Sequence, residues 1–211
     1  MDAFILNFTG KTTTEMEVSY TNTHQSYVKL INNEVDLIVV TEPSEEELQL
    51  AKEKGLELEV TALVNEGFVF FVNKENPVNN LKLDEIRNVY KGEITNWKEF
   101  GGNDADMVVY QRPTNSGSKT GLLSLVMNGL EVKVPTSTET IATMAGIVDI
   151  VSDYDNGIHA IGYSYYYYAN VMYKNDNLKY LAIDGIEPNY TTIQKGSYPL
   201  RTKYYIVTRK G

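Results

Sequence analysis

Cysteine is absent from the 211-residue sequence, and histidine occurs only twice. The chain therefore has no disulfide, no thiolate nucleophile and no cysteine metal ligand. His24 and His159 lack the carboxylate–histidine spacing of a metal site, so we expect neither a metal nor another cofactor. No window approaches the roughly 18 consecutive apolar residues of a membrane-spanning helix, and residues 1–3 lack the basic start of a signal peptide.

Basic residues are also scarce relative to acidic ones. Lysine and arginine number 19 against 28 aspartate and glutamate residues, which gives a formal net charge of -9. This balance argues against a nucleic-acid partner, which requires a clustered basic surface, and against binding to anionic membranes. An anion bound by such a chain must be held by local dipoles and hydrogen bonds, so we expect a recessed site.

Motifs of nucleotide binding and of catalysis are absent too. A Walker motif would need glycine in place of Pro113 and of Ser118, ahead of Lys119-Thr120, and the sequence contains no G-x-G-x-x-G. Neither a G-x-S-x-G elbow nor a Ser-His-Asp arrangement is present. We therefore expect no nucleotide chemistry and no enzymatic activity.

The most informative segment that is present covers residues 108–120. An apolar strand there leads into an arginine, a polar turn and the start of a helix. A helix N-terminus has unpaired backbone N–H groups and favours negative charge. Arg112 would supply a guanidinium fork, whereas Ser116, Gly117 and Ser118 would supply hydroxyl and backbone donors. The segment predicts a site for a tetrahedral oxyanion, with an ordinary capped helix as the alternative interpretation.

Apolar runs alternate with amphipathic segments along the rest of the chain. This alternation is typical of α/β proteins, whose ligands lie where the carboxyl ends of parallel strands meet helix N-termini. A second polar corner, residues 21–26, can face the first across a cleft between two lobes. The pattern predicts strands at 17–20, 35–40, 58–63 and 67–72, helices at 26–32, 43–54 and 83–90, and the end of another helix at 3–8.

Aromatic residues concentrate at 163–168, where five of the six residues are tyrosine. We expect these side chains to pack between the lobes with their hydroxyls at the surface. A stacked site for a sugar or an aromatic ligand is the alternative. The single tryptophan, Trp97, is expected in the core.

A combination of short segments carries a family resemblance. The segments are Leu83-Asp84-Glu85-Ile86, Tyr90-Lys91-Gly92-Glu93-Ile94-Thr95-Asn96-Trp97, Gly101-Gly102, and Arg112 followed by Ser116-Gly117-Ser118. In this combination the sequence resembles the phosphate-binding proteins of ABC transporters, a branch of the type II periplasmic or extracellular solute-binding protein superfamily. Ser118 stands where the family has threonine, so a hydroxyl is retained. The resemblance continues through residues 160–163 and Tyr198-Pro199-Leu200.

The resemblance implies a two-lobed α/β fold, each lobe a mostly parallel sheet flanked by helices, with crossover strands near residues 68–71 and 163. The first lobe would comprise residues 1–69 and 164–211. The second would comprise residues 70–163 and carry the anion-binding helix N-terminus with Arg112, Ser116, Gly117 and Ser118. The opposing wall in the first lobe would carry four residues: Thr23, His24, Ser26 and Thr41.

The implied function is non-enzymatic binding of a small oxyanion, phosphate before others, between the lobes for delivery to an ABC transporter. The implied partners are an ABC permease or a membrane sensor. The implied location is outside the cytoplasmic membrane, as a lipoprotein in a longer form. The alternatives are a receptor for another oxyanion such as sulfate, and a shortened relative that acts as a sensory or interaction module with weak or no phosphate binding.

The sequence departs from the family pattern at three places. We expect the chain to begin after the family's first strand and its Gly-Ser-Thr loop, which would weaken phosphate binding and expose a sheet edge for self-association. His24 stands where the family has a serine. Thr41 followed by Glu42 stands where some members carry an acid that accepts the proton of hydrogen phosphate.

Overall fold

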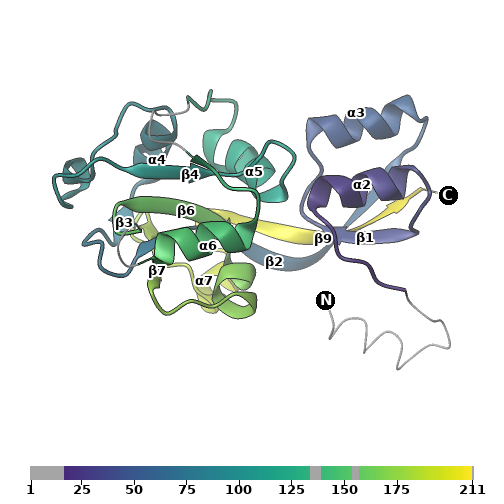
Figure 1. Ribbon diagram of the computed structural model, residues 1–211. Coiled ribbons are helices and arrows are strands. Elements are labelled where there is room, and N and C mark those ends of the chain that lie inside the picture. The colour runs from purple at the N-terminus through teal and green to yellow at the C-terminus, as the bar shows by residue number, and fades with distance from the viewer. Residues whose placement is uncertain (1–16, 134–138, 154–156, 211) are drawn as a thin grey trace.

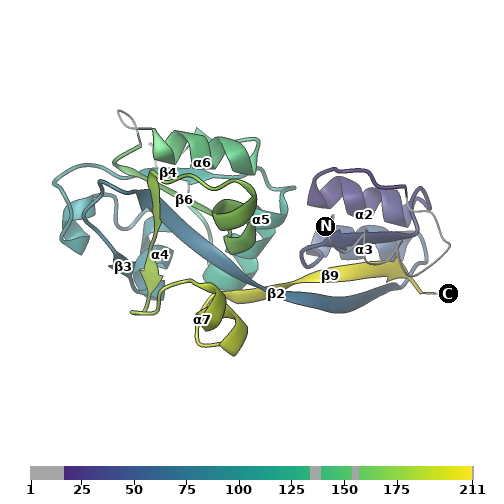
Figure 2. The same cartoon turned by 90° about the horizontal axis from the view of Figure 1, so that it is seen from below.

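The computed structural model describes residues 17–133, 139–153 and 157–210. The predicted helix end at 3–8 lies outside these residues. Buried apolar side chains form two clusters, a smaller one around residues 23–53 and a larger one around most of the other elements. Two neighbouring strands, β2 (Leu58–Asn73) and β9 (Arg201–Arg209), join the two bodies (Figure 1 and Figure 2).

The smaller cluster forms because two amphipathic helices cover one face of a short sheet. Asn22 caps the first helix by accepting a hydrogen bond from the Gln25 backbone N–H at 2.8 Å. Ser44 and Glu47 form a capping box at the start of the second, which is the helix that the sequence predicts at 43–54. The elements are α2 (Thr23–Ile31), β1 (Leu37–Val40) and α3 (Glu45–Glu53), packed on parts of β2 (Leu58–Asn73) and β9 (Arg201–Arg209).

Strand β2 is one continuous strand, so the prediction of separate strands at 58–63 and 67–72 is wrong. Its first part pairs with β9 from Leu58 to Gly67, and its second part pairs with β6 (Ala160–Tyr165) and β7 (Leu178–Tyr180). The polar residues between the two predicted strands are paired with β9, with a register shift between Ala62 and Val64. Pairing with a strand distant in sequence therefore overrides the local turn signal.

The predicted strand at 17–20 is also wrong. These residues form no helix or strand and are exposed. Strand β1 is the last strand on its side of the described sheet, so residues 17–20 add no strand to it. The helix predicted at 26–32 begins earlier than expected, at Thr23.

The larger cluster packs around the part of the sheet that contains the second part of β2. Helix α4 occupies residues 83–90 as predicted. The elements are β3 (Asn80–Leu81), α4 (Leu83–Tyr90), the 3-10 helix η1 (Trp97–Phe100), β4 (Val108–Gln111), α5 (Gly117–Gly121), the π-helix η2 (Leu122–Met127), β5 (Glu139–Thr140), α6 (Met144–Ser152), β6 (Ala160–Tyr165), the π-helix η3 (Tyr168–Met172), β7 (Leu178–Tyr180), β8 (Ala182–Ile183) and α7 (Tyr190–Lys195).

The sheet is mixed. Its strand order is β1-β9-β2-β6-β4-β5, with β7 also paired to β2. Strand β4 pairs in parallel with β5 and β6, whereas the β1–β9, β2–β9, β2–β6 and β2–β7 pairs are antiparallel. The α/β class is confirmed, and the parallel pairing lies beside the segment that carries Arg112.

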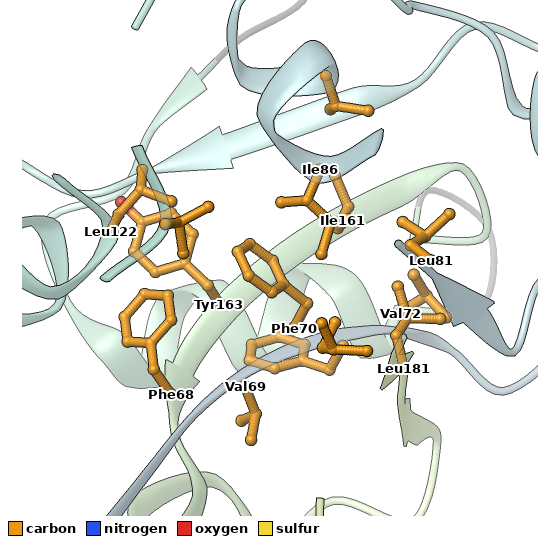
Figure 3. Packing of buried hydrophobic residues seen from close by; sticks show 14 of the residues in the cluster. Phe68, Val69, Phe70, Val72, Leu81, Ile86, Leu122, Ile161, Tyr163 and Leu181 are labelled. Atoms are coloured by element: carbon orange, nitrogen blue, oxygen red, sulfur yellow. The ribbon is translucent and has the colours of Figure 1, made fainter. Parts of the chain in front are cut away.

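Aromatic side chains dominate the larger cluster. Phe70 is fully buried, and its ring centroid lies 5.7 Å from that of Phe68 and 6.2 Å from that of Tyr163. Figure 3 shows these rings between the strands, close to Leu122 of η2. Trp97 is buried, as the sequence predicts. The large rings hold β2, β6 and the helices above them in one body.

The tyrosines of β6 are not arranged as expected. Tyr163 and Tyr165 are buried, and their hydroxyls bond inside the protein instead of reaching the surface. The expectation of surface hydroxyls is therefore wrong for these two residues, because backbone groups beside the N-terminus of α5 partner them. Tyr167 is exposed.

Glu66 is a buried carboxylate in the middle of β2. Its Oε1 accepts hydrogen bonds from the backbone N–H groups of Gly67 at 2.8 Å and Tyr167 at 3.2 Å, and burial raises its pKa. Residues 164–200 contribute Leu181, Tyr198 and other side chains to the larger cluster. The clusters do not define moving units, so the lobe boundaries given above stay a prediction.

Candidate functional site

Arg112 directly follows β4 and is 9% exposed. Its backbone N–H donates to the Tyr163 hydroxyl at 3.0 Å, and its Nη1 donates to the Ile141 carbonyl at 3.0 Å. Its Nε has no partner, and it forms no ion pair with a carboxylate of the described residues. Burial lowers the pKa of Arg112, and nearby Tyr163 and Tyr168 oppose that shift. A buried guanidinium without a counter-ion favours a bound anion.

The segment after Arg112 forms the start of α5. Ser116 is the N-cap, and its Oγ accepts from the Lys119 backbone N–H at 3.2 Å. Gly117 and Ser118 are the first helical residues, so no carbonyl of the helix can accept from their N–H groups. Ser118 is 2% exposed and its hydroxyl has no partner. The predicted donors therefore lie together, and several of them are unused.

Two residues of the smaller cluster contact this helix start. A Cβ placed on Gly117 would collide with the Thr23 hydroxyl and lie 2.6 Å from Thr41 Oγ1. Thr23 begins α2, and Thr41 directly follows β1. The structure thus brings together three of the predicted site residues from three different elements, and only glycine fits between them.

The Thr41 hydroxyl is buried beside the Tyr165 phenol. That phenol donates its proton to the Gly117 carbonyl at 2.9 Å, and its oxygen can accept a hydrogen bond from the Thr41 hydroxyl. The unused groups at this junction are therefore those of Arg112 and Ser118.

His24 and Ser26 point to partners within the smaller body. His24 Nδ1 lies 3.0 Å from Glu47 Oε1, and Ser26 Oγ donates to the Asn22 carbonyl at 3.0 Å. Ser26 lies in the first turn of α2, which begins at Thr23 and not at Ser26 as the sequence predicts. These contacts direct both side chains to groups other than Arg112 and Gly117.

Sequence reasoning missed two contacts beside the predicted site. Ser124 of η2 donates to the Glu42 carboxylate, which links the larger body to the residue after Thr41. Lys119 Nζ donates to the Gln111 side-chain oxygen, and both residues are buried. A signal for the second contact was present, because Gln111 is a polar residue at the end of an apolar strand.

Neither a metal cluster nor a membrane span is found in the part of the chain that the structure describes. No three His, Asp or Glu side chains there group as metal ligands. No helix there is long and apolar enough to cross a membrane.

Comparison with curated proteins finds phosphate-binding proteins. The phosphate-binding protein PstS of Bacillus subtilis is 28% identical over 134 residues, which cover 64% of this chain and 41% of that protein. PstS of Staphylococcus saprophyticus is 25% identical over 188 residues, covering 87% of this chain and 58% of the relative. The chain spans about half the length of the curated relatives it matches.

Solved structures share the fold. A substrate-binding protein of Clostridium perfringens, assigned to phosphate ABC transport and solved with bound phosphate, aligns with a TM-score of 0.79 at 24% identity over 99% of this chain and 81% of that one. An ABC-type phosphate transport receptor of Vibrio cholerae aligns with a TM-score of 0.72 at 23% identity over 98% and 81%. These likenesses confirm the fold of type II periplasmic binding proteins.

A family model matches the whole sequence. It is described as the PBP superfamily domain and covers residues 1–211. The resemblance seen in residues 83–120 is thereby confirmed. The chain belongs to the PBP superfamily.

Proposed function

We propose that this chain binds a small tetrahedral oxyanion, phosphate before others, by non-covalent contacts at the start of α5. The observation that carries the proposal is the buried guanidinium of Arg112, which has no counter-ion among the described residues and shortly precedes the unpartnered Ser118 hydroxyl. The names of the curated relatives, which are phosphate-binding proteins, support the choice of phosphate.

The proposed binding residues keep the division made from the sequence. Arg112 supplies charge and paired donors, and Ser116, Gly117 and Ser118 supply the helix start. Thr23 and Thr41 form the facing wall, because both contact the position of Gly117. His24 would contact the anion only if its side chain left Glu47, and Ser26 only if its hydroxyl left the Asn22 carbonyl. The lobes would be residues 1–69 with 164–211, and 70–163.

The wider role that we propose is non-enzymatic capture of the anion, in which no covalent bond is made or broken. The anion would be passed to an ABC permease or a membrane sensor, at a location outside the cytoplasmic membrane, with anchoring as a lipoprotein in a longer form. The roles of the matched relatives, phosphate binding and ABC-type phosphate transport, support this assignment.

Titration calorimetry with inorganic phosphate tests the proposal. We expect saturable binding to the wild-type chain and no measurable binding to Arg112→Ala. A hydrogen bond to a charged group contributes about 1.5–3 kcal/mol, so losing two lowers affinity more than about a hundredfold. Arg201→Ala, which removes an exposed arginine, is the matched control and should bind as wild type.

Sulfate competition in the same titration tests the ligand. Weak competition by sulfate supports phosphate, whereas stronger binding of sulfate supports a receptor for another oxyanion. A folded wild-type chain that takes up no anion, or an Arg112→Ala chain that binds normally, would contradict the proposed site.

A second candidate role, self-association, is favoured by the edge of the smaller sheet. Strand β1 is apolar and ends the described sheet, so its outer backbone groups form no ladder there. An unprotected edge strand is a template for pairing with another chain. We propose that two copies pair along β1.

The substitution Val39→Lys should prevent such pairing. We expect wild-type chain to shift from monomer to dimer as its concentration rises in light scattering coupled to gel filtration, and Val39→Lys to stay monomeric, because an edge lysine blocks pairing. Thr61→Lys is the matched control, since Thr61 lies in the same cross-strand row on the opposite edge. A wild-type chain that is monomeric throughout, or equal effects of both lysines, would rule out the β1 interface.

A further inference from the structure

Lys119 is a buried cation that the proposed anion site does not yet use. It is 7% exposed and lies in the first turn of α5, one residue after Ser118. Its ammonium group donates to the Gln111 side-chain oxygen and forms no ion pair with any carboxylate of the described residues. Burial lowers the pKa of Lys119. A buried ammonium with only a neutral partner is costly to the folded chain.

Gln111 does not compensate this charge. It is 3% exposed, and it directly precedes Arg112 in the sequence. Its oxygen accepts from Lys119, and its amide nitrogen has no partner. The pair therefore leaves an amide donor unused in the interior and adds positive charge behind the start of α5, where Ser118 also has an unused hydroxyl.

The other titratable groups around α5 do not neutralise Lys119. Strand β6 presents the phenols of Tyr163 and Tyr165, and burial raises the pKa of each, so both are uncharged at neutral pH. The carboxylate of Glu42 accepts from Ser124 of η2 and forms no ion pair with Lys119. Arg112 is the other charged group at this end of β4 and is itself without a counter-ion among the described residues.

We infer that Lys119 is the second positive charge of the anion site and makes it select divalent over monovalent oxyanions. The inference rests on the proposed function. Two buried cations are balanced by two negative charges, and Coulomb energy in a poorly solvated site scales with the charge of the ligand. Lys119 acts through its field and through Gln111, so it is a positioning and selectivity residue and not a direct ligand.

The pH dependence of phosphate binding tests this inference. Inorganic phosphate changes from mainly monovalent to mainly divalent between about pH 6 and about pH 8. We expect the wild-type affinity to rise about tenfold over this range, which corresponds to about 1.4 kcal/mol. Lys119→Met should lose about tenfold in affinity at the upper pH and little at the lower pH, so that its pH profile is nearly flat.

Three further measurements separate selectivity from folding. Gln111→Glu places a carboxylate beside Lys119 and should flatten the profile as Lys119→Met does, although the lysine remains. Lys195→Met removes an exposed lysine and should leave the wild-type profile unchanged. Thermal unfolding of ligand-free Lys119→Met should occur at or above the wild-type temperature, because the substitution removes an uncompensated buried charge.

The outcomes distinguish this inference from the proposed function. Wild-type chain that binds neither phosphate nor sulfate contradicts the proposed function itself. Phosphate binding that Arg112→Ala abolishes, with a Lys119→Met profile as steep as wild type, overturns the role of Lys119 alone. A lower unfolding temperature of Lys119→Met together with equal losses at both pH values shows a structural role and likewise overturns the inference.

Discussion

Gly117→Ala is expected to weaken phosphate binding about a hundredfold, or about 2.7 kcal/mol, with little change in the free energy of unfolding. The added methyl group would collide with the Thr23 hydroxyl and lie within 2.6 Å of the Thr41 hydroxyl. The strain is relieved when the smaller body moves away from the start of α5. That movement separates the facing walls of the proposed site, while alanine itself favours the helix.

Calorimetry with phosphate and chemical denaturation measure the two quantities on the same protein. Leu123→Ala is the matched control, because it places alanine on the exposed side of the same helical segment. This control should bind phosphate as wild type. Equal phosphate affinity of Gly117→Ala and wild type would show that the contact of Gly117 with Thr23 and Thr41 is not part of the site.

Phe70→Ala is expected to lower the free energy of unfolding by about 4 kcal/mol, within the range of about 3–5 kcal/mol for buried phenylalanine. Phe70 is fully buried, and its ring lies against those of Phe68 and Tyr163 (Figure 3) and of Tyr90. Truncation leaves a cavity that these large rings cannot fill without leaving their rotamers. The melting temperature should fall by about 10 °C.

Phe100→Ala controls for the loss of a phenylalanine in general. Phe100 is only partly buried at the edge of the larger cluster, where its ring lies 6.2 Å from Trp97. Its truncation should cost less than half as much in urea denaturation. If the two variants are equally stable, the centre of the core does not lie at Phe70.

The elements that the sequence predicts well are those with local signals. The capping box of Ser44 and Glu47 and the apolar face of residues 83–90 depend on neighbours within one or two turns, and both helices form as expected. The continuity of β2 has no such signal. Asn65, Glu66 and Gly67 are typical of a turn, and only pairing with β9, more than a hundred residues away, keeps them extended.

The candidate site likewise contains one part with a local sequence signal and another part without one. Arg112, Ser116 and Ser118 are near neighbours in sequence, so a local pattern suffices to group them. The contact of Gly117 with Thr23 and Thr41 depends on tertiary packing, and the resemblance to a family supplied the expectation. Whether these residues bind the anion stays a prediction.

Two contacts near the candidate site have no local signal in the sequence. His24 Nδ1 lies beside Glu47 on the next helix, which no spacing rule indicates. Lys119 is buried although lysine is seldom buried without a counter-ion. Its ammonium group donates to the Gln111 side chain at the end of β4, a contact that depends on the tertiary fold.

The strands that join the two bodies also determine how these bodies are oriented. Strands β2 and β9 form an antiparallel ribbon between the two bodies, and the register shift between Ala62 and Val64 lies along it (Figure 2). Strands twist as they pair, and the twist increases where the register shifts, so this ribbon sets the angle between the two bodies. It thereby fixes the direction from which Thr23 and Thr41 approach Gly117.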